Sequence, residues 1–172
     1  MNLDYFIDRF SQNRGVFESL VRDVRVEQDR WKPSADKWSI LEVVNHLYDE
    51  EREDFRQRIE LVLSNPAQAW PPIDPRGWVS TRGYNERELD PSLNNFLAER
   101  EKSLAWLRQL SEPNWPNSNE GPNGTLTAGD LLASWLAHDF LHMRQLARLH
   151  WQYLGAIADP YQTTYAGSWK ES

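Results

Sequence analysis

Four stretches of the sequence place apolar side chains at intervals of three, four or seven residues, the spacing of one face of an α-helix. They cover about residues 3–30, 39–64, 90–110 and 127–153. Ser39 followed by Glu42 is a capping-box pattern at the start of the second stretch. Thr127 caps the fourth, with Asp130 in its first turn. No stretch alternates as a strand does, so the pattern predicts an all-α protein, a four-helix bundle.

The second and third predicted helices are joined by an unusually long connection. Residues 65–89 lack periodicity and contain many prolines and glycines, and structureless loops of this length are uncommon in compact domains. Trp70, Trp78 and Tyr84 lie in this segment, so we expect it to pack on the bundle as a lid or as a cover for one end. Residues 112–126 form a second irregular stretch. The expected architecture is a bundle with one long crossover loop.

The length and composition suit a single domain. The chain has 172 residues, of which 40% are hydrophobic, enough to form one apolar core. We expect one bundle domain over residues 1–155. An irregular tail, residues 156–172, should follow it and dock its aromatic side chains on the bundle or on a neighbouring subunit.

The net charge and the cysteine content limit which partners and which kinds of chemistry are expected. The net charge of −7 disfavours nucleic acids and anionic membranes as partners, because both repel an acidic surface. The absence of cysteine excludes thiolate metal ligands and a cysteine nucleophile. The sequence has no run long enough to span a membrane and no signal-peptide pattern at its N-terminus. We therefore expect a cytoplasmic protein.

Two histidines stand out on the fourth predicted helix. His138 and His142 lie one turn apart within the apolar stripe that Leu131 and Trp135 begin. This spacing lets two imidazoles reach one metal ion. The alternative is a pair of core histidines with ordinary hydrogen-bond partners. Two stacked rings need partners for more ring nitrogens, and an unpaired buried polar group costs about 1–3 kcal/mol. Spacing alone leaves both readings open.

His46 and His150 are the remaining histidines. His46 lies on the second predicted helix, away from its main apolar stripe, so this helix alone predicts a surface position. Glu50 lies one turn later beside it and is placed to orient it or to reach a metal. His150 falls to one side of the His138–His142 stripe, and we interpret it as structural.

Two motifs resemble a known family. The first is Trp38-Ser39-Ile40-Leu41-Glu42-Val43-Val44-Asn45-His46-Leu47, and the second runs from Thr125-Leu126-Thr127 to His138-Asp139-Phe140-Leu141-His142-Met143-Arg144-Gln145-Leu146. Together they are similar to the DinB-like superfamily, also called DinB/YfiT-like metalloenzymes. The resemblance implies a four-helix bundle with a long crossover. It also implies a metal held by His46, His138 and His142.

The resemblance also implies classes of activity. Family members include S-transferases and isomerases that depend on a low-molecular-weight thiol, and a metal-binding domain of sulfoxide synthases. The synthase pattern has a glutamate two residues after the second histidine of this helix, where the present sequence has Arg144, so that chemistry is not implied. Members often pair through bundle faces, which makes a homodimer the expected assembly.

Three imidazole ligands leave an open coordination position, as catalytic sites do. Nitrogen ligands suit Zn, Ni or Fe(II) and do not distinguish among them. Such an ion either activates water, giving a hydrolase, or activates a thiolate, giving the S-transferase that the family precedent favours. A small-molecule substrate is expected in both cases. A non-catalytic metal-binding or stress-response module is the alternative.

Five further residues complete the predicted site. Glu50 and Asp139 are candidates for orienting a ligand or transferring a proton, and the competing interpretation is an ordinary solvated carboxylate. Trp135, Trp78 and Tyr84 are candidates for walls of a substrate pocket. Ordinary core or loop packing is the competing interpretation for these aromatic residues.

Overall fold

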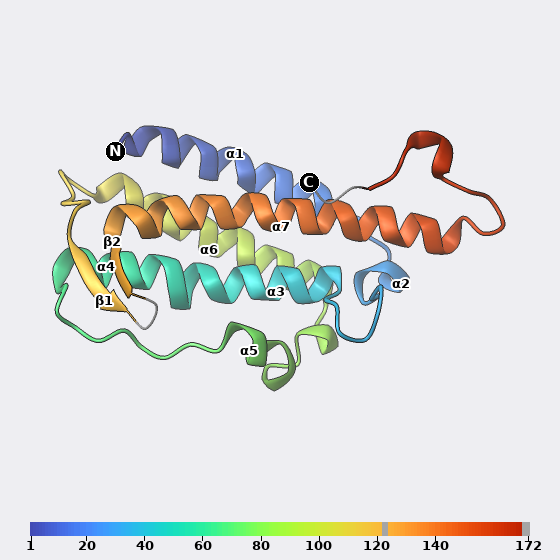
Figure 1. The fold of residues 1–172 in the computed structure, drawn as a ribbon, viewed down its shortest axis with the longest axis horizontal. Coiled ribbons are helices and arrows are strands. Elements are labelled where there is room, and N and C mark those ends of the chain that lie inside the picture. The colour runs from blue at the N-terminus through green and yellow to red at the C-terminus, as the bar shows by residue number, and fades with distance from the viewer. Residues whose placement is uncertain (122–123, 170–172) are drawn as a thin grey trace.

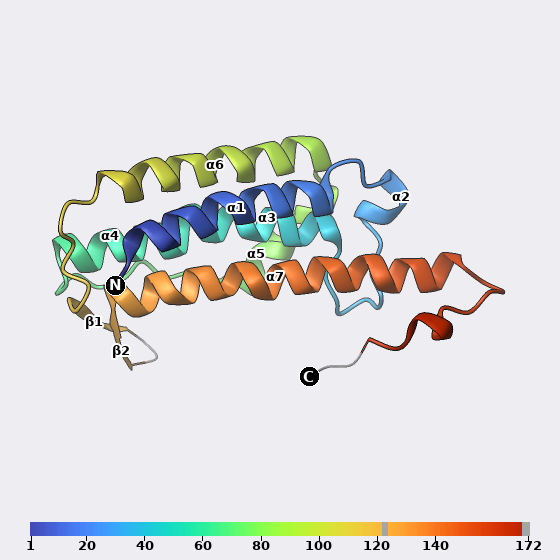
Figure 2. The ribbon, with the colours of Figure 1, turned by 90° about the horizontal axis from the view of Figure 1, so that it is seen from above.

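The computed structural model describes residues 1–121 and 124–169. Residues 122–123 of the second irregular stretch and 170–172 of the predicted tail lie outside the described residues. Four long helical segments form a bundle (Figures 1 and 2). They are α1 (Leu3–Val21), α3 continued by α4 (Ile40–Glu50 and Arg56–Ser64), α6 (Leu89–Gln109) and α7 (Ala128–Ile157). Each segment packs on two others, in the cyclic order α1, α6, α3–α4, α7, so the predicted four-helix bundle is confirmed.

The first helix is shorter than predicted. It ends at Val21, and a separate short helix, α2 (Val26–Asp29), follows. The chain breaks because Arg22 is extended and Asp23 adopts a left-handed conformation with φ of 66°. The prediction of one helix over residues 3–30 was wrong because the apolar spacing continues across this break.

The second helix contains a widened turn. Between α3 and α4 the chain forms a π-helical segment, η1 (Glu51–Phe55), that keeps the helix continuous. Such turns insert one residue and rotate the faces that follow, and they are frequent at functional sites. Here the turn buries Glu51 and Asp54. The predicted start of this helix is confirmed, because Ser39 and Glu42 form a complete capping box.

The crossover is more ordered than predicted. It contains a short helix, α5 (Pro75–Thr81), and a 3-10 turn, η2 (Tyr84–Glu86), both of which pack on α3. Asp74 caps α5 by accepting a hydrogen bond from the Gly77 amide. Gly83 supplies the left-handed conformation, with φ of 57°, between the two helical pieces. The crossover therefore covers α3 rather than forming a structureless loop.

A small hairpin contradicts the expectation that no strand forms. Strands β1 (Ser118–Gly121) and β2 (Gly124–Thr127) pair antiparallel, with Asn119 opposite Leu126. The Asn119 side chain donates hydrogen bonds to the carbonyls of Pro66 and Gln68 and so ties the hairpin to the crossover. The next helix, α7, starts from the predicted cap and runs to Ile157, beyond the expected end near residue 153. In the tail, a 3-10 turn (Thr164–Ala166) is present.

The core consists of two apolar clusters separated by a polar layer. One cluster includes Phe17, Leu41 and Leu146, and the other includes Phe10, Ile59 and Leu132. Between them, each helical segment contributes buried polar residues, which include Asn13, Glu50, Glu51, Asp54, Arg100, Asp139 and His142. Among the described residues, no helix is both long and apolar enough to cross a membrane.

Candidate metal centre

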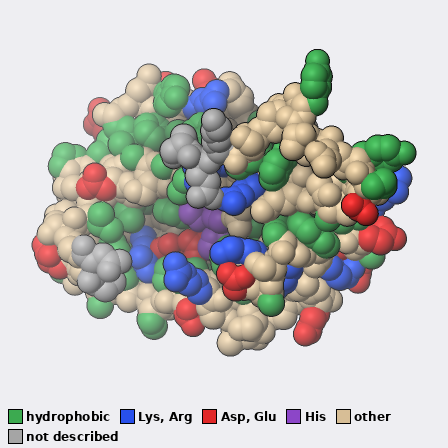
Figure 3. Space-filling model, turned by 45° about the vertical axis from the view of Figure 1, so that its right-hand side comes forward, with side chains coloured by type: hydrophobic (Ala, Val, Ile, Leu, Met, Phe, Trp, Pro, Cys, Tyr) green, Lys and Arg blue, Asp and Glu red, His purple; other side chains and the backbone are tan. Residues whose placement is uncertain are grey.

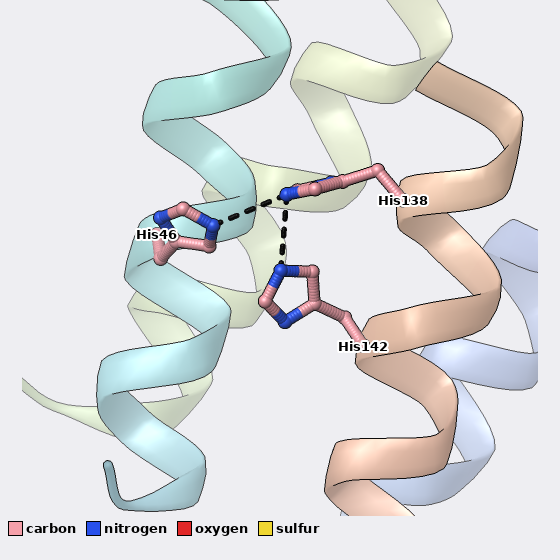
Figure 4. Close-up of side chains that lie close together, drawn as sticks. All are labelled: His46, His138 and His142. Carbon is pink, nitrogen blue, oxygen red and sulfur yellow. Dashed lines mark hydrogen bonds between the residues drawn. The ribbon is translucent and has the colours of Figure 1, made fainter. Parts of the chain in front are cut away.

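Three histidines from two helices converge at the edge of the polar layer. Figure 4 shows His46 projecting from α3 toward His138 and His142 of α7. The Nε2 atom of His138 lies 3.2 Å from that of His46 and 3.0 Å from that of His142. One ligand atom from each ring lies within 4.8 Å of the others. Nitrogens bound tetrahedrally to one ion at ~2.1 Å lie ~3.4 Å apart, so the cluster fits a divalent metal.

The position of His46 corrects the expectation drawn from its helix alone. The residue is 5% exposed and so does not lie on the surface. All residues of α3 are buried except Tyr48, because α6 and α7 cover one side and the crossover covers the other. The indole of Trp38 also packs on His46, with ring centroids 4.8 Å apart.

Burial keeps the three rings neutral. Desolvation lowers the pKa of His46 to about 3, of His138 to about 2 and of His142 to about 4. Repulsion from neighbouring histidines adds to the effect at His46 and His138. A neutral imidazole offers one nitrogen lone pair, which is the form that a metal requires.

A hydrogen bond sets which nitrogen of His142 is available. The Nδ1 atom lies 2.8 Å from Oε1 of Gln145. Because an amide oxygen only accepts, Nδ1 carries the proton and Nε2 keeps its lone pair toward the cluster. The Nε2 atom of each ring is thus the ligand atom that this arrangement favours.

Two buried polar atoms next to the cluster have no hydrogen-bond partner. They are Nδ1 of His46 and Oε1 of Glu50, which lie 4.0 Å apart. Burial, followed by the neighbouring Asp54, raises the pKa of Glu50 well above the usual carboxyl range. Asp54 in turn pairs with Arg58 at 2.6 Å. Sequence reasoning identified Glu50 and missed Asp54, which the widened turn η1 buries.

Asp139 lies within a buried ionic network. Its carboxylate accepts two hydrogen bonds from Arg100 and one from Asn13. The guanidinium of Arg100 also binds Glu51 with two hydrogen bonds. Sequence reasoning missed Arg100, although it occupies the apolar stripe of α6 between Leu97 and Leu104. A charged residue within an apolar stripe indicates a buried charge, and this position could have identified Arg100 from the sequence.

The three aromatic residues predicted to line a pocket, Trp135, Trp78 and Tyr84, have contacts with residues other than the three histidines. Trp135 is buried, donates its indole N–H to Glu51 and stacks on Phe55. Tyr84 is buried and donates its hydroxyl to Asp49 at 2.5 Å. Trp78 lies beneath the guanidinium of Arg82.

Other rings contact the histidines directly. The Phe55 ring centroid lies 5.1 Å from that of His138. The Trp38 ring contacts His46 and lies nearly parallel to His142, with centroids 6.5 Å apart. Trp38 and Phe55 therefore border the centre, and Trp38 lies in the first family-like motif.

His150 lies outside the centre, as expected. Its Nε2 atom lies 2.7 Å from the carbonyl oxygen of Leu20, and its Nδ1 atom lies 2.7 Å from the side-chain nitrogen of Gln28. The ring thus connects the end of α7 to the α1–α2 region, which is a structural role.

The three-histidine centre opens onto one face of the molecule. The space-filling view shows histidine atoms near the middle of this face, with acidic side chains beside them and basic side chains around them (Figure 3). A bundle with histidines from two helices around an accessible centre has the general form of a metal-binding helical protein.

Comparison with known proteins defines the family. The family model of the DinB superfamily matches residues 9–146, and the chain belongs to this superfamily. Among solved structures, it is similar to one described as "YfiT from Bacillus subtilis is a probable metal-dependent hydrolase with an unusual four-helix bundle topology". The identity is 19%, the TM-score is 0.78, and the match covers 88% of this chain and 87% of that one. No curated protein matches significantly.

Proposed function

We propose that this protein is a divalent-metal-dependent hydrolase acting on a small molecule. The observation that carries the proposal is the convergence of three neutral imidazoles at one accessible point. Three ligands leave a coordination position for water or substrate. A divalent ion held there supplies Lewis-acid chemistry, because it lowers the pKa of water toward ~7 and polarises a carbonyl. Zn, Ni and Fe(II) all suit the nitrogen ligands.

The surrounding residues take separate roles in this proposal. Gln145 holds the tautomer of His142, and Trp38 and Phe55 limit the access of water. Glu50 is the candidate for orienting His46 or moving a proton, because its unpartnered Oε1 atom lies 4.0 Å from Nδ1 of that ring. Asp139 has a positioning role and no direct part in the reaction, because both of its carboxylate oxygens accept hydrogen bonds from Arg100.

The fold likeness to the Bacillus subtilis protein supports hydrolysis, because that protein is described as a probable metal-dependent hydrolase. Trp135, Trp78 and Tyr84 remain predictions as pocket residues. Their contacts point to indirect roles, in which Trp135 supports Phe55 and Tyr84 supports Asp49.

A thiol-dependent S-transferase is the second candidate. The same open position accepts a thiolate, and the family resemblance favours this chemistry. Because the chain has no cysteine, the thiol must come from a separate low-molecular-weight cofactor. A non-catalytic metal-binding or stress-response module is the third reading.

One assay distinguishes these candidates. Protein loaded in turn with zinc, nickel and iron(II) would be tested for hydrolysis of a panel of small esters and amides, with and without added thiol. The hydrolase proposal expects metal-dependent turnover without thiol that His138→Ala abolishes. His150→Gln is the control, since that ring lies outside the centre. Turnover of an electrophilic substrate only with thiol would support the transferase, and no turnover of any kind would support the binding module.

The homodimer, the cytoplasmic location and the absence of nucleic-acid partners stay predictions from the sequence. Size-exclusion chromatography with light scattering would test the first. A mass of one chain of 20.2 kDa would contradict the homodimer.

A further inference from the structure

Two half-buried aromatic side chains flank the three-histidine centre. Trp38, which precedes α3, contacts His46 with ring centroids 4.8 Å apart. Phe55, the last residue of η1, contacts His138 with ring centroids 5.1 Å apart. Part of each aromatic residue remains accessible to solvent, and so does part of His138. A ligand that reaches the histidines therefore lies beside aromatic surface.

A third apolar side chain lies on α7 next to the histidines. Leu141 follows His138 by three residues, so the two side chains share one side of the helix. Leu141 is 57% exposed. A single exposed leucine is ordinary on a protein surface, but this one lies beside a partly exposed histidine of the centre. We call Trp38, Phe55 and Leu141 the apolar border of the centre.

Charged side chains around the opening (Figure 3) leave this border in contact with the ligand atoms. Asp54 and Arg58 pair with each other at 2.6 Å. Oε1 of Glu50 lies 4.0 Å from Nδ1 of His46, whereas Nε2 of the same ring is the atom that faces His138. Small-ligand sites are lined mainly by apolar and aromatic side chains, with a few polar groups that fix orientation. The apolar border and the histidine nitrogens match this division.

We propose that the substrate is a small ester or amide that carries an aromatic ring or a similarly apolar group beside the bond to be cleaved, and that the apolar border binds this group. The inference rests on the proposed function for the cleavage step. That step consumes one water, whose hydroxyl goes to the acyl carbon and whose proton goes to the departing oxygen or nitrogen. Recognition of the apolar group belongs to the border, because burial of apolar surface stabilises a complex without a metal.

The first experiment compares three probes on the zinc-loaded protein. Acetohydroxamate, benzohydroxamate and the monohydroxamate of succinic acid share one metal-binding group, and they carry a methyl, a phenyl and a carboxylate-bearing substituent. Calorimetric titration should give benzohydroxamate an affinity at least ~10-fold higher than that of either other probe. Equal affinities of the methyl and phenyl probes would overturn the proposal. Binding of the carboxylate probe as tight as that of the phenyl probe would also overturn it.

Variants assign the phenyl preference to the border. Trp38→Ala and Phe55→Ala should each reduce it by ~3-fold or more and leave the affinity for acetohydroxamate unchanged. Leu141→Gln should reduce it by ~2-fold, and its exposed position removes any risk to the fold. Leu154→Gln, at a 49% exposed position farther along α7, is the matched control and should preserve the preference. A preference that survives in all three border variants would contradict the assignment.

A second measurement does not depend on a metal. In the metal-free protein, benzamide but not acetamide should shift the NMR signal of the Trp38 indole N–H, which Trp38→Phe identifies by its loss. If this shift occurs while zinc fails to bind, the proposed function fails and the border assignment stands. If zinc binds and benzamide causes no shift, the border assignment fails alone.

Discussion

At the scale of single residues, the centre is defined by buried polar atoms without partners. Nδ1 of His46 and Oε1 of Glu50 are both buried without a hydrogen bond, and each such atom costs about 1–3 kcal/mol. A protein retains groups of this kind where their chemistry is needed. By the same reasoning His150 does not belong to the centre, because both of its ring nitrogens have partners.

Replacement of Glu50 by glutamine should change how stability depends on pH. Burial raises the pKa of Glu50 above its ordinary value of 4.5, so the folded state retains a proton that the unfolded chain releases. In the wild type this contribution is complete below about pH 4.5 and is lost as the pH rises toward the folded-state pKa. Glu50→Gln should therefore gain stability relative to the wild type between pH 5 and pH 8, by about 1–3 kcal/mol.

Urea denaturation of the metal-free proteins at several pH values would measure this difference. Glu60→Gln, at an exposed position on α4, is the control, and its free energy of unfolding should depend on pH as that of the wild type does. A Glu50→Gln variant with that same dependence would show that the Glu50 pKa is not raised.

At the scale of elements, the ionic network fixes how the four helical segments meet. Arg100 of α6 binds Glu51 of η1 and Asp139 of α7, and Asn13 of α1 also binds Asp139. All four side chains are buried. Because Asp139 lies between His138 and His142 in the sequence, this network also sets the position of the ligand-bearing turn of α7.

Arg100→Met should destabilise the fold by about 3–5 kcal/mol, because it leaves two buried carboxylates without their counter-charge. Urea denaturation measures the loss, and zinc affinity provides a second readout that should also fall. Arg108→Gln should stay within about 0.5 kcal/mol of the wild type, as exposed substitutions usually do. Equal effects of the two substitutions would rule out a special role for the network.

The sequence predicted element starts better than element ends. Ser39 and Thr127 cap helices as expected, because capping depends on local hydrogen bonds. The break at Asp23 and the widened turn at Glu51 were missed, since apolar spacing continues through both. The hairpin was missed because each strand has four residues, too few for a clear alternation.

At the scale of the whole molecule, the burial of His46 depends on a segment far away in sequence. The crossover helix α5 and turn η2 cover the side of α3 that a single helix would expose. No pattern within residues 40–50 contains this information, so spacing predicted the His138–His142 pair but not the third histidine. Only the family resemblance grouped His46 with His138 and His142.

The domain boundary near residue 155 stays a prediction, and truncation would test it. Most described residues after Ala158 are exposed, and within the described tail the Trp169 ring contacts that of Trp151 on α7. A chain ending at Ala158 should keep its free energy of unfolding within about 1 kcal/mol of the full chain. A loss of more than about 3 kcal/mol would place the tail within the domain.

The most direct test of the three-histidine centre is elemental analysis of protein purified after exposure to zinc, nickel or iron(II). The wild type and His150→Gln should each retain about one ion per chain, whereas His46→Ala, His138→Ala and His142→Ala should each retain little. A wild type without bound metal, or a His138→Ala variant that retains as much as the wild type, would contradict the account.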